Sequence, residues 1–347
     1  MAEENRVNQN DVAKRAGVSR SVVSYVLNNG PRKVAKETRQ RVLRAIEELG
    51  YRPNEHAQRL KQGQDFASNS IGILTGGEGY DIMERPYYNI LLSELYQQAY
   101  DHNQQISFLA YWNAMKDPIF FNKHIHTQEI SSLILILPSY IPDDEDNQAL
   151  LTETIERIPN IICLEETVRN LPAVTFDRAQ AARTVMEHLI SLGHRKIAFI
   201  GINDGRLTGY KHSLFEHHIP YKEELVDFIS TAKSPYTSAY EITMNLLDSG
   251  VEFSAICTAT DEAAIGTIAA LTDRGLTVPD DIALASIDNL EVSGMIRPAL
   301  TTVDIPTRTL AKHTIQALQT QKEYGMDSPV SMVVPTKLIV RESCGSK

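Results

Sequence analysis

The sequence predicts a small all-α head joined to an α/β body of two doubly wound parallel sheets, of the periplasmic-binding-protein-like kind. Short apolar runs recur after residue 70, and amphipathic stretches of helical length separate them, as in parallel sheets covered on both faces. The head is marked by charge: residues 1–63 hold 13 Lys and Arg against 7 Asp and Glu, whereas the remainder hold 21 against 37. The basic segment is the part expected to meet a polyanion, although a basic surface without a ligand would show the same charge.

Length and composition narrow the class of protein. A chain of 347 residues suits two or three domains, and it contains no apolar run of about 18 residues that would span a membrane. The N-terminal segment lacks the apolar region of a secretory signal. Two of the three cysteines, Cys163 and Cys257, lie in apolar runs, which suits a reducing compartment. We therefore expect a cytoplasmic, nucleoid-associated protein without a membrane partner.

Three helices are predicted in the head. Asn8 can cap the first together with Asp11, Gly17 ends it, and Ser19 caps the second. Asn8 is also expected at the DNA. The third runs from about Lys36 to Leu49. Helix, glycine-containing turn and helix within about twenty residues is the helix-turn-helix pattern. Apolar residues at helical spacing predict its core: Val12, Ala13, Ala16, Val23, Val26, Leu27, Val42, Leu43, Ile46 and Leu49.

The second helix is the expected DNA reader. Its outer face carries one strong donor and several polar side chains that can approach base edges: Arg20, Ser21, Ser24, Tyr25 and Asn28. Basic residues elsewhere in the head are placed to meet phosphates: Arg32, Lys33, Arg39 and Arg41. The alternative is a small helical bundle used for protein contacts.

A short hinge helix is predicted after Pro53. Asn54 can cap it, and it has little apolar surface of its own, so it is expected to form only against a partner copy and DNA. Asn54, His56 and Gln58 lie on this segment and are expected at the DNA. Leu60 can wedge into a minor-groove base step, or it packs on the following domain.

The body alternates predicted strands and helices. The predicted strands are 71–74, 106–111, 133–137, 161–164, 196–201, 254–259 and 281–287. The predicted helices are about 88–102, 147–157, 178–192, 206–218, 237–249, 261–274 and 307–321. In such sheets a ligand binds beyond the carboxyl ends of the strands. Aromatic and polar residues follow several of these ends, and their mixture suits a sugar or nucleoside: Trp112, Glu165, Asp204, Asp261 and Asp288. Taken singly, each polar residue is explained as well by a turn or a helix cap, and Trp112 by packing.

Motifs of enzymes were sought and none was found. The sequence contains no H-E-x-x-H, G-x-S-x-G, Walker loop or Cys-x-x-Cys pair, and its glycine-rich GGEGYD segment lacks G-x-G-x-x-G. Two histidine pairs, at 124 and 126 and at 217 and 218, are better explained as solvated surface residues than as metal ligands. We expect no catalytic residues, no cofactor and no metal. An exported sugar-binding protein would share the body but would need a signal peptide and would not carry the head.

Two segments of the head, DVAKRAGVSRSVVSYVLNN at 11–29 and TRQRVLRAIEELGYRPNEHAQRL at 38–60, closely resemble the lactose/galactose-repressor family. The resemblance is dense over 7–61 and continues more loosely to RES at 341–343, through GHRKIAF, the Arg206 helix start and the segment 258–289. It implies that Arg20 and Ser21 read bases and that Leu60 is the minor-groove lever. Tyr25 stands where many members carry arginine.

The same resemblance implies effector-binding roles in the body. Arg206 and Asp261 match effector-binding positions, Tyr88 matches an aromatic that stacks on the ligand, and Glu165 stands where an aspartate is frequent. Thr260 replaces the usual asparagine. Trp112 and Asp288 complete the predicted site through their positions after strands.

The implied function is a sequence-specific transcriptional regulator, a repressor of carbohydrate-utilisation genes. A homodimer would bind a near-palindromic operator in double-stranded DNA, with a small ligand, expected to be a sugar, bound between two subdomains. A nucleoside, purine or phosphorylated metabolite is an alternative ligand, and a sugar-binding module without a regulatory role is an alternative of another class. The expected domains are the head at 1–52, hinge and linker at 53–69, and the body at 70–347. The N-subdomain is expected at about 70–164 plus 290–322, and the C-subdomain at about 165–289 plus 323–347.

Overall fold

The computed structural model describes residues 7–27, 34–51, 69–76, 82–324 and 331–345. Contacts between Cα atoms divide the described residues into two units. Unit 1 takes those within 1–78, 95–173 and 313–330, and unit 2 takes those within 79–94, 174–312 and 331–347.

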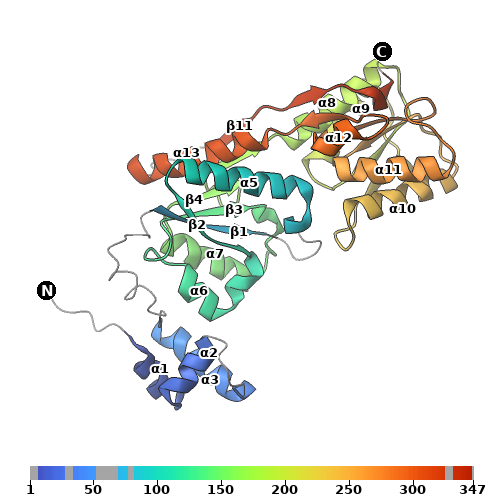
Figure 1. Cartoon of the computed structure of the whole chain (residues 1–347). Coiled ribbons are helices and arrows are strands. Elements are labelled where there is room, and N and C mark those ends of the chain that lie inside the picture. The colour runs from blue at the N-terminus through green and yellow to red at the C-terminus, as the bar shows by residue number, and fades with distance from the viewer. Residues whose placement is uncertain (1–6, 28–33, 52–68, 77–81, 325–330, 346–347) are drawn as a thin grey trace. The chain divides into compact units, whose positions relative to one another are not determined.

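The head is the three-helix structure that the sequence predicts (Figure 1). The helices are α1 (Gln9–Ala16), α2 (Arg20–Leu27) and α3 (Lys36–Leu49). Their buried side chains form one apolar cluster, made of Val12, Ala13, Ala16, Val23, Val26, Val42, Ala45, Ile46 and Tyr51. Leu27, Leu43 and Leu49 are only partly buried against this cluster.

The predicted caps of the head helices are confirmed. The Asn8 side chain accepts a hydrogen bond from the Asn10 amide at 2.8 Å, and the Asp11 carboxylate accepts one from the Asn8 amide at 2.8 Å. Asn8 and Asp11 therefore form a reciprocal capping box at the start of α1. Gly17 ends the helix with φ 64°, a left-handed conformation that glycine adopts without steric cost.

The body contains twelve strands among its described residues. They are β1 (Ser70–Thr75), β2 (Gln105–Tyr111), β3 (Ser132–Ile136), β4 (Ile161–Leu164), β5 (Ala173–Phe176), β6 (Ile197–Gly201), β7 (Val226–Phe228), β8 (Ala255–Thr258), β9 (Ala283–Asp288), β10 (Thr301–Asp304), β11 (Ser331–Val334) and β12 (Lys337–Ile339).

The α-helices of the described body are α5 (Pro86–Asp101), α6 (Pro118–His124), α7 (Glu145–Arg157), α8 (Arg178–Ser191), α9 (Gly205–Glu216), α10 (Pro235–Asp248), α11 (Asp261–Asp273), α12 (Glu291–Met295) and α13 (Thr307–Tyr324). Short 3₁₀ turns are η3 (Ile82–Glu84), η4 (Trp112–Lys116), η5 (Pro138–Tyr140), η6 (Glu223–Leu225) and η7 (Glu342–Cys344).

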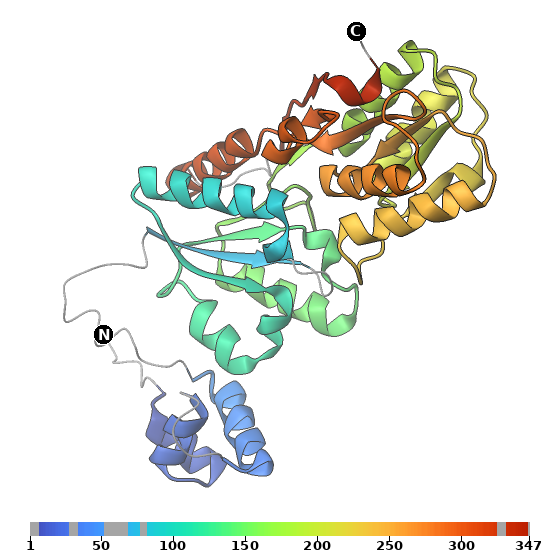
Figure 2. The same ribbon diagram turned by 45° about the vertical axis from the view of Figure 1, so that its right-hand side comes forward.

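The first sheet has the strand order β11-β5-β4-β3-β1-β2. Strand β1 pairs parallel with β2 and β3, and β3 pairs parallel with β4; β1 and β3 are buried along their whole length. In Figures 1 and 2, α6 and α7 cover one face of this sheet and α13 lies over the other. A strand with helices on both faces has no solvated side, which explains why its sequence is a continuous apolar run.

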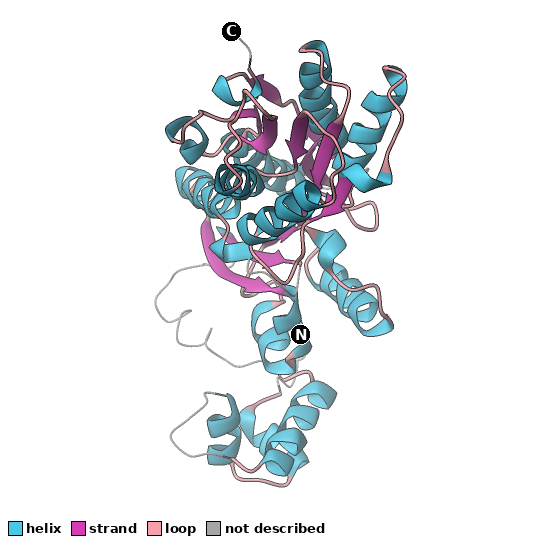
Figure 3. Ribbon diagram, turned by 90° about the vertical axis from the view of Figure 1, so that its right-hand side faces the viewer, coloured by secondary structure: helices cyan, strands magenta, loops and turns pink. Residues whose placement is uncertain are grey.

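The second sheet has the order β12-β10-β9-β8-β6-β7. Neighbouring strands within this sheet are parallel, except that β12 pairs antiparallel with β10. Helices α8 and α9 pack on each other, as do α10 and α11, and Figure 3 shows strands flanked by helices. Gly209 permits the α8–α9 approach, because a Cβ at this position would lie 2.1 Å from the Ala179 carbonyl oxygen. The two sheets confirm the predicted fold class.

The division of the body differs from the expected subdomains near residue 300. The segment 290–322 was assigned to the N-subdomain, but β10 at Thr301–Asp304 pairs with β9 in the second sheet. The segment TTVD has no apolar run, so the sequence does not identify it as a strand. Its threonines are nevertheless fully buried, because their hydroxyls find partners inside the protein.

Candidate functional site

Polar residues gather at the carboxyl ends of three strands in unit 2. Asp204 and Arg206 follow β6, Asp261 begins the helix after β8, and Asp288 is the last residue of β9. These strands are neighbours and parallel, so their carboxyl ends share one edge of the sheet. The structure therefore brings together Arg206, Asp261 and Asp288 of the predicted effector-binding set.

Arg206 is buried and held by Asp204. Its Nη2 donates to Asp204 Oδ2 at 2.7 Å, its Nε donates to the same carboxylate, and its Nη1 donates to the Ala259 carbonyl at 3.0 Å. Burial by itself would lower the pKa of Arg206, but the Asp204 carboxylate outweighs it and the pKa is raised. Burial by itself would raise the pKa of Asp204, and Arg206 instead holds that pKa below its usual value. The pair is thus charged, with a fixed guanidinium plane.

Asp261 is fully buried, and its carboxylate is used by the protein. One oxygen accepts hydrogen bonds from the Leu290 amide at 2.8 Å and the Ser293 hydroxyl at 2.6 Å, and the other accepts from the Thr302 hydroxyl at 2.7 Å. Burial raises its pKa, and the bonds from Ser293 and Thr302 oppose that rise. This carboxylate ties the start of α11 to β10 and to the chain after β9.

Asp288 combines burial with a backbone that is unusual for its residue type. Its φ of 131° lies in a region that L-residues rarely adopt. Burial raises its pKa well above the usual value and repulsion from Asp261 adds to this, while Arg206 and Arg85 act in the opposite direction. Strain and a perturbed carboxyl at one position are typical of functional sites.

Arg85 is a site residue that sequence reasoning missed. Its Nε lies 3.3 Å from Glu262 Oε2, and its guanidinium carbon lies 5.5 Å from the centroid of the Tyr88 ring. Tyr88, a predicted effector-binding residue, is buried at the start of α5 and packs edge-on against Tyr87. A charged residue directly before a Pro-Tyr-Tyr helix start was the available signal, but its partner Glu262 lies 177 positions away.

For Trp112 the sequence leaves two roles open, stacking on a ligand or packing, and its surroundings favour packing. Its side chain is 2% exposed and belongs to the apolar core of unit 1. The indole N–H donates to Asn147 Oδ1 at 2.8 Å, and Asp144 in turn accepts from the Asn147 amide nitrogens. The indole is buried with its single donor satisfied, so its role is packing.

Glu165 follows β4 and is buried, with its backbone at φ 72°. It belongs to unit 1, whereas Arg206 and its neighbours belong to unit 2. The structure thus places Glu165 at a strand end, as predicted, and leaves its part in a ligand site a prediction.

Most of the described residues that are predicted to contact DNA lie on α2. Arg20 and Ser21 are exposed in the first turn of α2, and Ser24 and Tyr25 are half-buried one turn later. Arg20 Nε donates to Gln9 Oε1 at 3.3 Å. Asn8, predicted at the DNA, is exposed while it caps α1. Five further predicted DNA-binding residues lie outside the described residues: Asn28, Asn54, His56, Gln58 and Leu60.

None of the helices in the described part of the chain is long and apolar enough to cross a membrane.

Two family models match the chain. Residues 9–54 match the bacterial regulatory proteins of the lacI family, and residues 186–344 match the periplasmic binding protein-like domain. The HTH-type transcriptional regulator GalR of Salmonella typhimurium is 31% identical over 317 residues, which cover 87% of this chain and 85% of that protein. The HTH-type transcriptional regulator AscG of Escherichia coli is 30% identical over 341 residues, covering 96% and 97%.

Solved structures share the fold. A complex of the transcriptional regulator CelR with cellobiose superposes with a TM-score of 0.69 at 24% identity, covering 97% of this chain and 100% of that chain. The Lac repressor dimer bound to operator and the anti-inducer ONPF gives 0.67 at 24% identity, covering 98% and 99%.

The raised pKa of Asp288 predicts how stability depends on pH. Because the folded state holds this proton more tightly than the unfolded chain, the free energy of unfolding falls as pH rises from about 4 through the folded pKa. Asp288→Asn removes this contribution, so the variant gains stability relative to wild type as pH rises. Urea unfolding across a pH series measures the difference. Asp280→Asn, at an exposed carboxylate, is the control, and a pH profile of Asp288→Asn parallel to wild type would contradict the raised pKa of Asp288.

Proposed function

The chain belongs to the lacI family of bacterial regulatory proteins, and from this premise we propose that it is a repressor of carbohydrate-utilisation genes. It binds a near-palindromic operator as a homodimer, and a sugar changes its affinity for that operator. The sugar binds at a set of charged residues, here called the Arg206 cluster: Arg85, Arg178, Arg206, Asp204, Glu262 and Asp288. One observation carries the proposal: a single chain holds an exposed reading helix and, in its body, a buried set of arginines and carboxylates.

The head supports direct reading of bases. Arg20 is exposed at the start of α2 and steadied by Gln9, so its planar guanidinium is available for the two acceptors of a guanine in the major groove. Ser21, Ser24 and Tyr25 follow within two turns. One head reads one half-site, and a two-fold dimer matches a near-palindromic operator.

The charges of the cluster support a neutral, hydroxyl-rich ligand. Arginines and carboxylates alternate there, with Arg85, Arg178 and Arg206 against Asp204, Glu262 and Asp288. Sugar hydroxyls donate to carboxylates and accept from guanidinium groups, so both signs are satisfied at once. A strongly charged ligand would meet a repelling group beside each attracting one.

Within this proposal Asp261 and Asp288 have different roles. Both oxygens of Asp261 already accept bonds from Leu290, Ser293 and Thr302, so we assign Asp261 to holding the site in shape. Asp288 and Arg206 are assigned to the ligand, with Tyr88 as the ring that packs on it. Ligand and operator then act on one conformational equilibrium of the body, so each changes the affinity of the protein for the other by the same factor.

The relatives are named as transcriptional regulators, which supports a role without catalysis. We assign no catalytic residue, and we place the protein in the cytoplasm, on the nucleoid.

Arg20→Ala is expected to weaken operator binding by roughly 1–3 kcal/mol and to relax the base preference at one operator position. Selection from random-sequence duplexes followed by anisotropy titration measures both effects. Arg41→Ala, which removes an exposed charge from α3, should weaken all sequences about equally. An equal loss on all sequences for Arg20→Ala would remove Arg20 from the reading role.

Arg206→Ala is expected to abolish the ligand response and to leave operator affinity within about twofold of wild type, a change below 0.5 kcal/mol at RT of about 0.6 kcal/mol. A thermal-shift screen of sugars identifies the ligand, because binding to the folded state raises Tm. Arg297→Ala, which removes an exposed guanidinium that donates to backbone carbonyls, should keep the full response. A full Tm shift retained by Arg206→Ala would mean that the ligand binds elsewhere.

A further inference from the structure

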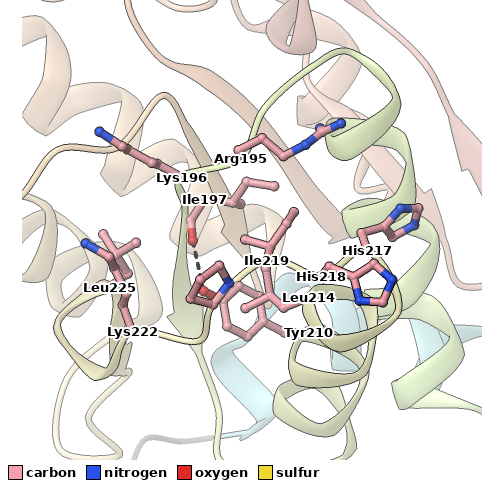
Figure 4. A pocket seen from close by; sticks show the side chains of 11 residues that line it. Arg195, Lys196, Ile197, Tyr210, Leu214, His217, His218, Ile219, Lys222 and Leu225 are labelled. Atoms are coloured by element: carbon pink, nitrogen blue, oxygen red, sulfur yellow. Dashed lines mark hydrogen bonds between the residues drawn. The ribbon is translucent and has the colours of Figure 1, made fainter.

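Unit 2 contains a pocket of about 390 Å³ (Figure 4). It lies at the amino end of β6, against the last turns of α9 and the chain leading into η6. Volumes of this size are within the range of small-molecule sites.

The pocket is separate from the Arg206 cluster. Arg206 stands in the first turn of α9, whereas Leu214 and His217 at the other end of the helix line the pocket. Eleven residue steps along α9 separate Arg206 from His217, which amounts to roughly 16 Å. The same separation applies to β6, whose carboxyl end leads to Asp204 and whose amino end, at Ile197, lines the pocket.

The floor of the pocket is apolar and fixed. Ile197, Tyr210, Leu214 and Leu225 line it, and all four are buried in the protein. The Tyr210 hydroxyl donates to the Ile197 carbonyl at 2.9 Å, the bond drawn in Figure 4, so the polar end of this ring is satisfied. A floor of this kind accepts an apolar or aromatic group without leaving a buried donor unpaired.

The rim of the pocket is basic. Arg195, Lys196 and Lys222 line it together with His217 and His218, and none of the described lining residues is acidic. In Figure 4 the two histidines lie on one side and the two lysines on the other. All five side chains are on exposed residues, so they can turn toward a ligand.

Acidic neighbours of the rim offset only part of its charge. Lys196 pairs with Glu252, and Lys222 Nζ lies 3.2 Å from Glu224 Oε1. Exposed ion pairs of this kind contribute little free energy, so a ligand can compete for these lysines. Among the described residues, the Arg195 guanidinium donates only to carbonyl oxygens, those of Ile190 at 2.8 Å and His194 at 2.9 Å. The carboxyl end of α9 adds roughly half a negative charge, which the charge of Arg195 alone exceeds.

We propose that this pocket is a second ligand site and that it binds a small phosphate ester with an apolar or aromatic portion. The ring lies on the floor formed by Ile197, Tyr210 and Leu214, and the phosphate accepts from Arg195 and from the lysines of the rim. This assignment is independent of the sugar site and adds a second class of ligand to the same unit.

The test is calorimetric titration of the full chain with 1-naphthyl phosphate, 1-naphthol and inorganic phosphate. Floor and rim act together only on the ester, so 1-naphthyl phosphate should bind at least tenfold more tightly than either fragment. No binding of the ester at millimolar concentration, or equal affinity for ester and inorganic phosphate, would overturn the proposal.

Variants assign the binding to this pocket. Arg195→Ala removes a charged donor and should weaken binding of the ester about tenfold or more, and Ile219→Trp, which fills the pocket from a half-buried position, should also weaken it. Arg297→Ala removes a guanidinium with similar carbonyl contacts outside the pocket and should bind as wild type does. Equal weakening by Arg195→Ala and Arg297→Ala would indicate diffuse charge attraction and contradict the site. Ester binding that Arg206→Ala abolishes while Arg195→Ala leaves it intact would place the ester in the Arg206 cluster instead.

Discussion

The buried carboxylate of Asp261 is the constraint on which one edge of the second sheet depends, the edge that carries Arg206 and Asp288. It accepts hydrogen bonds from the backbone after β9, from α12 and from β10, three segments that lie 29 to 41 positions along the chain. Burying a carboxylate costs free energy unless its oxygens accept hydrogen bonds, so the three donors and Asp261 hold one another in place. The segments that follow β8 and β9 are thereby fixed to each other and to β10.

The groups proposed to meet the ligand take their properties from that arrangement. Asp288 has a backbone φ of 131°; burial raises its pKa and repulsion from Asp261 adds to this rise, while Arg206 and Arg85 oppose it. Arg206 is held by Asp204 at the start of α9, and the close packing of α9 on α8 at Gly209 fixes the helix itself. A site whose donors and acceptors are already oriented spends little binding energy on ordering them.

The sequence alone predicts those parts of the molecule whose signal is local. The capping box of Asn8 and Asp11 and the apolar runs of strands such as β3 and β6 depend on neighbours within a few positions. Strand β10 was missed because Thr302 is buried through a bond to Asp261, 41 positions earlier. The sequence leaves the role of Trp112 open, because its acceptor Asn147 lies 35 positions later and a strand-end aromatic has the same local pattern whether it packs or faces a ligand.

The central claim is that one site for a ligand and one site for DNA are coupled in this chain. The most direct measurement is anisotropy titration of the full chain on its selected operator, with and without a saturating sugar that raises Tm. A coupling of 1–3 kcal/mol predicts that the operator Kd changes about 5- to 150-fold. An operator Kd that stays the same at saturating sugar would contradict the account.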